Sequence, residues 1–229
     1  MKVTFPVDFW WGGATSGPQN EGRFHKPHVN VFDYHYDTKP EDFFRYVGPD
    51  VASDFYHLYE SDIALFKELG FNSLRTSIQW TRLIDDLEEG TLNPEGVAYY
   101  NRVIDALLVA GIRPIINLHH FDLPIELYER YGGWESKHVV ELFVKFARRA
   151  FECFGDRVKD WMTFNEPMVV VEGQYLYGFH YPMLVDGKKA VQVAYNLQLA
   201  SAKAIQAYRQ INQNPAGRVT IALNLTPAY

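Results

Sequence analysis

The sequence predicts an α/β protein that forms the first part of a (β/α)8 barrel, also called a TIM barrel. Short segments that are apolar on both faces, as buried parallel strands are, alternate with longer segments whose apolar residues recur at helical spacing. A doubly wound sheet also has this alternation, but a further feature favours the barrel. Polar residues that suit catalysis stand at or just after the ends of the short segments, where barrel enzymes carry their chemistry. They are Arg75, His119, His120, Asn165, Glu166 and Asn224.

Five strands and four helices are predicted in alternation along the chain. The strands cover residues 9–14, 71–77, 114–119, 161–165 and 219–224, each bounded by polar residues, glycine or proline. The helices cover residues 54–69, 94–110, 136–154 and 189–211. Ser53 or Asp54 is expected to cap the first helix, and Asn93 followed by Pro94 begins the second.

We expect residues 1–229 to be the N-terminal part of a single barrel domain, apparently truncated, because five strands do not close an eight-stranded barrel. An open parallel sheet would leave two edges that need partners. Residues 22–52 are rich in His, Asp, Tyr and Pro and are predicted to form a long irregular loop. The glycine-rich residues 12–17 lack the spacing of a phosphate-binding loop, so we interpret them as a strand exit where two backbones pass closely.

Composition narrows the possible partners. The net charge of −6 and the absence of a basic cluster argue against nucleic acid, and no run of 18 apolar residues is present to cross a membrane. One cysteine, Cys153, excludes a disulfide within the chain and is predicted to be a buried packing residue. The start of the sequence lacks the apolar segment of a signal peptide, so the expected location is cytoplasmic.

The strongest local signal is a strand that ends in Asn165 and Glu166 and is stopped by Pro167. Glycoside hydrolysis needs a carboxylic acid that keeps its proton near neutral pH and donates it to the leaving oxygen. Strict alternation would send Asn165 and Glu166 to opposite faces, so both enter one site only if the chain leaves the pleat there. The alternative is that Glu166 merely caps a helix beginning at Pro167.

The other candidates have structural alternatives too. Of His119 and His120, one could be a core histidine and the other a residue of a surface loop. Adjacent histidines diverge and no companion ligand is evident, so no metal is expected. Arg75, at the predicted end of its strand, could form a structural ion pair or orient a catalytic carboxylate. Gln19 and Glu21 follow the first strand, and either could reach the top of the barrel.

Five motifs in this order, each at a strand–helix junction, resemble the family 1 glycoside hydrolases over essentially the whole chain. They are FWWGGAT (9–15) with QNEG (19–22), RTSIQW (75–80), LHHFDLP (118–124), YGGW (131–134) and TFNEP (163–167). The resemblance implies a retaining β-glycosidase on a (β/α)8 barrel that uses two glutamates and no metal or other cofactor. A different enzyme on the same barrel, such as an isomerase or aldolase, would want a Schiff-base lysine or a metal cluster that we do not find.

Carried over by position, Glu166 resembles the acid/base and Asn165 the partner of the sugar 2-hydroxyl. Gln19 and His120 resemble contacts to the sugar in the −1 subsite, and Arg75 resembles the residue that orients the nucleophile. That nucleophile lies in a motif beyond this chain.

Several of the motifs are most like the 6-phospho-β-glucosidase branch of the family. The expected partner is therefore a small β-glycoside, such as a 6-phosphorylated disaccharide, and an oligomer is compatible with the sequence. The alternative function is a half-barrel that binds sugar through Gln19, His120 and Asn165 without cleaving it.

Overall fold

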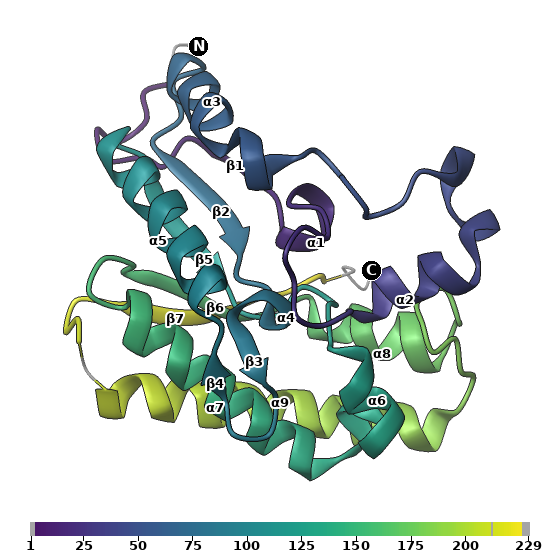
Figure 1. The fold of residues 1–229 in the computed structure, drawn as a ribbon. Helices are drawn as coiled ribbons and strands as arrows, with labels where there is room; N and C mark the ends of the chain where they lie inside the picture. The colour runs from purple at the N-terminus through teal and green to yellow at the C-terminus, as the bar shows by residue number, and fades with distance from the viewer. Residues whose placement is uncertain (1–2, 212, 226–229) are drawn as a thin grey trace.

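The strands of the sheet are all parallel and lie side by side in the order in which they occur along the chain (Figure 1). The computed structural model describes residues 3–211 and 213–225. The strands are β1 (Gly12–Ala14), β2 (Ser73–Ser77), β5 (Arg113–Asn117), β6 (Asp160–Asn165) and β7 (Arg218–Ala222). The long helices between them are α3 (Phe55–Glu68), α5 (Pro94–Val109), α7 (Lys137–Phe154) and α9 (Gly187–Ile211).

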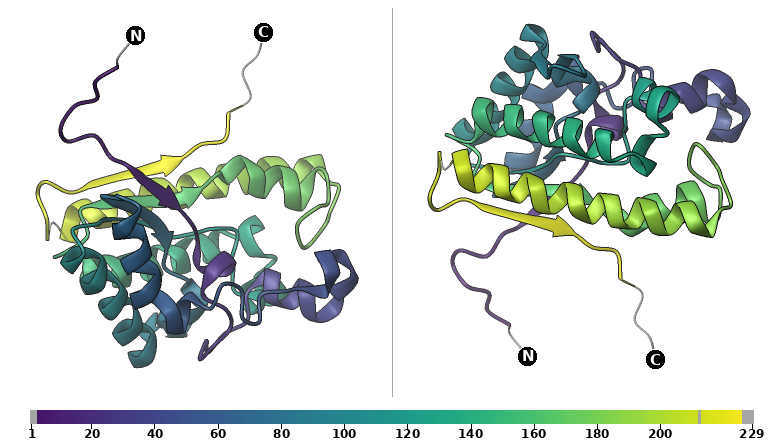
Figure 2. Two further views of the ribbon diagram at one scale, coloured as in Figure 1. Left: turned by 90° about the horizontal axis from the view of Figure 1, so that it is seen from above. Right: turned by 90° about the horizontal axis from the view of Figure 1, so that it is seen from below.

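This strand order excludes the doubly wound alternative. Parallel strands joined in sequence by right-handed crossovers place every crossover helix on the same face of the sheet. Figure 2 shows α9 lying along β7 with α7 beside it, and α7 packs directly against α9. A sheet wound in one direction with helices outside is the arrangement of a (β/α)8 barrel, as the sequence predicts.

The first strand is shorter than predicted. The paired register with β2 begins at Gly12, although the Trp11 carbonyl already accepts from the Ser73 amide. Before it, the Phe9 amide donates to the Pro6 carbonyl, and the Trp10 ring packs 4.5 Å from the Arg113 guanidinium. A Cβ added at Gly12 would lie 1.9 Å from the carbonyl oxygen of Ser73. The predicted close approach of two backbones at this strand is therefore confirmed.

The predicted end of the second strand, at residue 77, is confirmed, but the prediction that Arg75 stands at that end is wrong. β2 continues to Ser77, because Thr76 and Ser77 still pair with β5. Arg75 lies in the middle of the strand, and its long side chain spans the distance to the end of the sheet. β5 itself ends at Asn117 rather than at residue 119, where the Asn117 side chain donates to the His119 carbonyl.

Of the two predicted helix caps, the one at Asn93 is confirmed, and Ser136 caps a further helix. The Asn93 side chain accepts from the Glu95 amide at 3.3 Å, and Ser136 accepts from the His138 amide at 3.1 Å. Asp54 precedes α3 as expected but has a left-handed backbone (φ 55°) and makes no capping hydrogen bond. Its carboxylate instead contacts the His57 ring at 2.6 Å, so the predicted cap is absent.

The prediction of an irregular loop over residues 22–52 is also wrong. This segment contains α2 (Val31–Thr38) and 3-10 turns at Pro40–Asp42 and Phe44–Tyr46. A capping box between Asn30 and Asp33 starts α2. Other short elements escaped prediction because they are too short to show periodicity. They are α1 (Gly17–Asn20), α4 (Trp80–Leu83), the hairpin β3 (Ile84–Asp86) with β4 (Thr91–Leu92), α6 (Ile125–Tyr131), a 3-10 turn at Gly133–Glu135 and α8 (Pro167–Tyr175).

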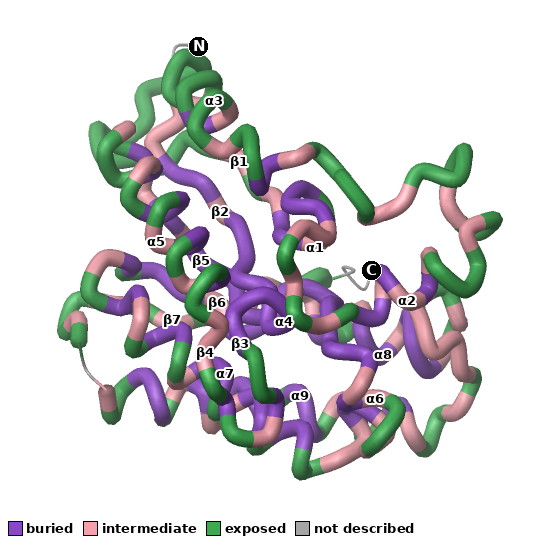
Figure 3. Tube along the Cα trace, in the orientation of Figure 1, coloured by how far each residue is buried: buried purple, intermediate pink, exposed green. Residues whose placement is uncertain are grey.

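The core lies between the sheet and the long helices, and buried residues follow the strands and the inner faces of these helices (Figure 3). Aromatic rings fill much of it. The Trp80 and Phe146 rings stack at 5.2 Å, and Phe151 meets Trp161 edge-on at 4.9 Å. Cys153 is half-buried rather than buried, because the buried stripe of α7 leaves it on the flank of the helix.

Candidate active site

The end of β6 breaks the regular pleat of the sheet. Met162 lies opposite Thr220 of β7, but Asn165 lies opposite Ala222, so β6 carries one more residue than its partner over this stretch. This extra residue is a β-bulge, a feature that re-aims side chains at the ends of strands. Glu166 follows with a left-handed backbone (φ 46°, ψ 62°). The chain therefore leaves the pleat where the sequence requires it to.

Neighbouring strands hold this unusual backbone on both sides. The Asn165 amide donates to the His119 carbonyl at 2.9 Å, and the Glu166 amide donates to the Ala222 carbonyl at 2.8 Å. A left-handed conformation costs a residue with a Cβ about 1–3 kcal/mol and persists where its surroundings determine it. Glu166 precedes α8, yet its side chain makes no capping hydrogen bond. The alternative interpretation of Glu166 as a helix cap is therefore wrong.

Arg75 joins the two residues at the end of β6. Its Nη1 donates to Asn165 Oδ1 at 2.7 Å. Burial lowers the pKa of the Arg75 guanidinium, and the nearby negative charge of Glu166 opposes that shift. One half-buried guanidinium thus fixes the Asn165 amide and lies beside the half-buried Glu166 carboxylate.

The two adjacent histidines diverge, as expected, but neither lies in a surface loop. The His119 ring is buried against Trp134 and Phe164, and burial followed by the neighbouring His120 lowers its pKa to about 3. The His120 ring is also buried, and its pKa is lowered to about 4 by burial and then by the positive charge of Arg75.

His120 is neutral at ordinary pH and has a free polar atom. Within the described residues, its Nδ1 is buried without a hydrogen-bond partner. Asp122 accepts from the His120 amide at 2.8 Å across Phe121, which is left-handed (φ 68°). This turn fixes the backbone that carries the ring, so the His120 imidazole is held in a defined position.

Gln19 lies on α1, whose first residue is bound to Ser77 at the end of β2, but it is not joined to the other four predicted residues. Its side chain accepts from Ser16 Oγ at 2.8 Å, and within residues 3–211 and 213–225 no hydrogen bond links it to Arg75, His120 or the end of β6. It lines a cavity of about 410 Å³, whose other walls include Pro18, Phe32, Phe43 and Val47.

Two residues considered from the sequence lie elsewhere. The Glu21 side chain is not exposed at the top of the sheet. It is buried, and its Oε2 forms an ion pair with Arg82 Nε at 2.8 Å. Asn224 follows β7 and is exposed. The structure therefore brings together Arg75, His120, Asn165 and Glu166, with Gln19 beside an adjoining cavity.

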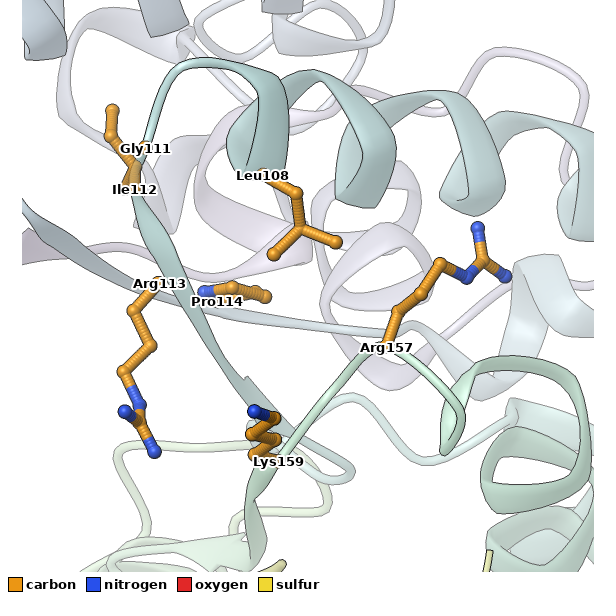
Figure 4. Close-up of a pocket in the computed structure, with 7 residues that line it drawn as sticks. All are labelled: Leu108, Gly111, Ile112, Arg113, Pro114, Arg157 and Lys159. Atoms are coloured by element: carbon orange, nitrogen blue, oxygen red, sulfur yellow. The ribbon is translucent and has the colours of Figure 1, made fainter. Parts of the chain in front are cut away.

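A second cavity, of about 270 Å³, lies at the opposite ends of the strands (Figure 4). Three basic residues line it, but Figure 4 shows the guanidinium groups of Arg113 and Arg157 pointing apart. Both are already paired, with Asp160 and Asp105 respectively. Because barrel enzymes carry chemistry at the carboxyl ends of their strands, this cavity is not the candidate site.

The four assembled residues combine a carboxyl group, an amide, a neutral imidazole and a guanidinium. Such a set can donate or accept a proton and bind several hydroxyl groups of one ligand. In the described part of the chain, no three His, Cys, Asp or Glu side chains form a group that could hold a metal ion. The helices that the structure describes include none long and apolar enough to cross a membrane.

Comparisons with known proteins agree with this geometry. A family model described as "Glycosyl hydrolase family 1" matches residues 1–229. The 6-phospho-beta-glucosidase GmuD of Bacillus subtilis (strain 168) is 49% identical over 230 residues, which cover 100% of this chain and 49% of GmuD. Beta-glucosidase A of Acetivibrio thermocellus is 37% identical over 230 residues, which cover 100% of this chain and 50% of beta-glucosidase A.

Among solved structures, a glutamate-to-glutamine mutant of a rice beta-glucosidase in a covalent complex with Glc superposes with a TM-score of 0.90. It is 33% identical, and the match covers 96% of this chain and 49% of the rice chain. The chain thus spans about half the length of the relatives it matches. The predicted fold and the predicted family resemblance are both confirmed.

We predict that His120 makes the folded state sensitive to mild acid. Its folded pKa of about 4 lies below the value of about 6.5 for an unfolded histidine, so the unfolded chain binds more protons between these values. This contribution to stability is present above the unfolded pKa and is lost as the pH falls towards 4, by about 1.4 kcal/mol per pH unit.

Denaturant unfolding between about pH 7 and pH 5 checks this, because His120→Gln should lose less stability than wild type over that range. His25→Gln, at an exposed histidine, is the control and should follow wild type. Equal losses in wild type and His120→Gln would show that His120 is not buried as a neutral ring.

Proposed function

We propose, since the chain belongs to glycosyl hydrolase family 1, that it is the N-terminal part of a (β/α)8 barrel that hydrolyses β-glucosides with retention of configuration. The observation that carries the proposal is the junction at the end of β6, where Arg75 binds Asn165 and lies beside Glu166. This arrangement places a carboxyl group, with hydrogen-bonding partners for a sugar, at the strand ends where barrel enzymes react.

In the proposed reaction, Glu166 serves both chemical steps. First, its carboxyl group donates a proton to the glycosidic oxygen while a second carboxylate attacks the anomeric carbon and the carbon–oxygen bond breaks. In the second step, the Glu166 carboxylate takes a proton from water as that water attacks the same carbon and releases the second carboxylate. Two inversions give net retention, and the two carboxyl groups must stand about 5–5.5 Å apart.

The remaining residues bind and orient. We propose that Asn165 holds the sugar 2-hydroxyl, because its amide is fixed by Arg75 at 2.7 Å beside Glu166. Arg75 orients the second carboxylate by charge. His120, through Nε2 because its Nδ1 is buried, and Gln19 bind other hydroxyl groups of the same sugar.

Two comparisons support the mechanism and the substrate. A covalent complex with sugar, as in the rice structure, is the intermediate that double displacement requires. The identity of 49% with GmuD, a 6-phospho-beta-glucosidase, supports a 6-phosphorylated β-glucoside as the substrate. The cytoplasmic location, the oligomeric state and the sugar-binding alternative stay predictions.

We predict that Glu166→Gln in the full-length protein lowers kcat on substrates with poor leaving groups by about two to four orders of magnitude. Substrates with excellent leaving groups should lose much less in the first step, because their departing oxygen needs little protonation. The measurement is the steady-state kinetics of wild type and Glu166→Gln on a natural disaccharide, which has a poor leaving group, and on an activated aryl glucoside, which has an excellent one. Glu141→Gln, on the exposed side of α7, is the matched control. Wild-type activity of Glu166→Gln on the disaccharide would refute the assignment.

We also predict that the full-length protein prefers the 6-phosphate ester of a chromogenic β-glucoside to the unmodified glucoside. The measurement is kcat/KM for both substrates under identical conditions. A preference for the unmodified glucoside would place the protein with the β-glucosidases of the family instead.

A further inference from the structure

A network of buried charged groups lies beside the candidate site and has no part in the proposed reaction. Its centre is the pair of Glu21 and Arg82, both almost fully buried. Glu21 Oε2 accepts three hydrogen bonds, from Arg82 Nε at 2.8 Å, Gln79 Nε2 at 2.8 Å and Tyr100 Oη at 3.1 Å. Burying an ion pair costs free energy unless hydrogen bonds satisfy both charged groups. Because these hydrogen bonds need defined geometry, they fix the side chains of the network in one arrangement.

A second buried ion pair, Lys26 with Asp33, meets the first through a single side chain. Gln79 Oε1 is 3.4 Å from Lys26 Nζ and 3.3 Å from Asn30 Nδ2. The Gln79 amide thus donates to one ion pair and accepts from the other. It is the link between the two pairs, and its own side chain is completely buried.

Gln79 also contacts both ends of the one-turn helix that carries Gln19. At the start of α1, a Cβ on Gly17 would lie 2.4 Å from Gln79 Cγ, so the two residues are packed as closely as a glycine permits. At the end of α1, Gln79 donates to Glu21. Gln19 lies between these two contacts. The Gly17 amide is fixed too, because it donates to Ser77 Oγ at 2.8 Å.

We infer that Gln79 is a positioning residue for Gln19, which it holds in place for sugar binding by clamping α1 at both ends. The inference rests on the proposed function, because Gln19 acts there as a sugar contact. A positioning residue acts through another residue, so its removal should weaken substrate binding more than the chemical step.

The test is a double-mutant cycle on the full-length protein with Gln19→Ala, Gln79→Leu and the double variant. Gln79→Leu keeps approximate size but removes the three side-chain hydrogen bonds, with Glu21, Lys26 and Asn30. We expect it to raise KM by about tenfold with a smaller fall in kcat. If Gln79 acts through Gln19, the double variant should have the KM of Gln19→Ala alone. The inference would be overturned if the KM increases of the two single variants multiplied in the double variant. It would also be overturned if Gln79→Leu had the KM of wild type.

Gln79→Glu is a second variant, should Gln79→Leu fail to fold. At high pH one oxygen of its carboxylate would face Lys26 and Asn30, as the amide oxygen does, and the other would repel the Glu21 carboxylate. Its protonated form can donate to Glu21 as the amide does and still accept from Lys26. The KM ratio of this variant to wild type should therefore fall as the pH is lowered. A ratio that does not change with pH would overturn the inference.

Phe151→Leu, which removes a buried ring that packs edge-on against Trp161 at the start of β6 and away from α1, is the control. It should lower Tm without changing KM. If wild type hydrolyses no β-glucoside, or Glu166→Gln retains full activity, the proposed function fails and the inference fails with it. The inference alone fails when wild type hydrolyses a β-glucoside, Glu166→Gln loses activity and the KM effects in the cycle are additive in free energy.

Discussion

The site depends on one local departure from regular strand geometry, at the end of β6. Alternation along a strand would separate Asn165 from Glu166, and the bulge before Asn165 together with the left-handed backbone of Glu166 removes that separation. Hydrogen bonds to the His119 carbonyl, just after β5, on one side and to β7 on the other hold the distorted backbone in place. The parallel sheet is therefore more than a scaffold, because the strands beside β6 determine where the proposed acid points.

Electrostatics give the four assembled residues different roles. The charged Arg75 guanidinium binds Asn165 and lies near Glu166. Burial and then the positive charge of Arg75 lower the pKa of His120, which keeps this imidazole neutral. A neutral imidazole and a fixed amide suit sugar hydroxyls, which are uncharged donors and acceptors. The buried ion pairs around Gln79 contact both ends of the helix that carries Gln19, so a proposed binding residue rests on groups that the proposed reaction does not use.

Much of the architecture could be predicted from the sequence, because apolar strands and long amphipathic helices carry strong periodic signals. Short helices such as α2 and α8 could not, since they span too few residues to show a period. The sequence predicts that the chain leaves the strand pleat near Pro167. It does not predict the bulge, because the bulge depends on how β6 pairs with β7. The position of Arg75 in mid-strand and the burial of Glu21 likewise depend on distant partners, Asn165 and Arg82.

The central claim is that Glu166 gives a proton to the leaving oxygen and later takes one from water. In Glu166→Ala, azide should replace water in the second step, because an anionic nucleophile needs no general base. The decisive measurement is the rate and product of Glu166→Ala on an activated β-glucoside with azide present. The account predicts faster turnover and a glycosyl azide of β configuration. No acceleration by azide, or a product of α configuration, would contradict it.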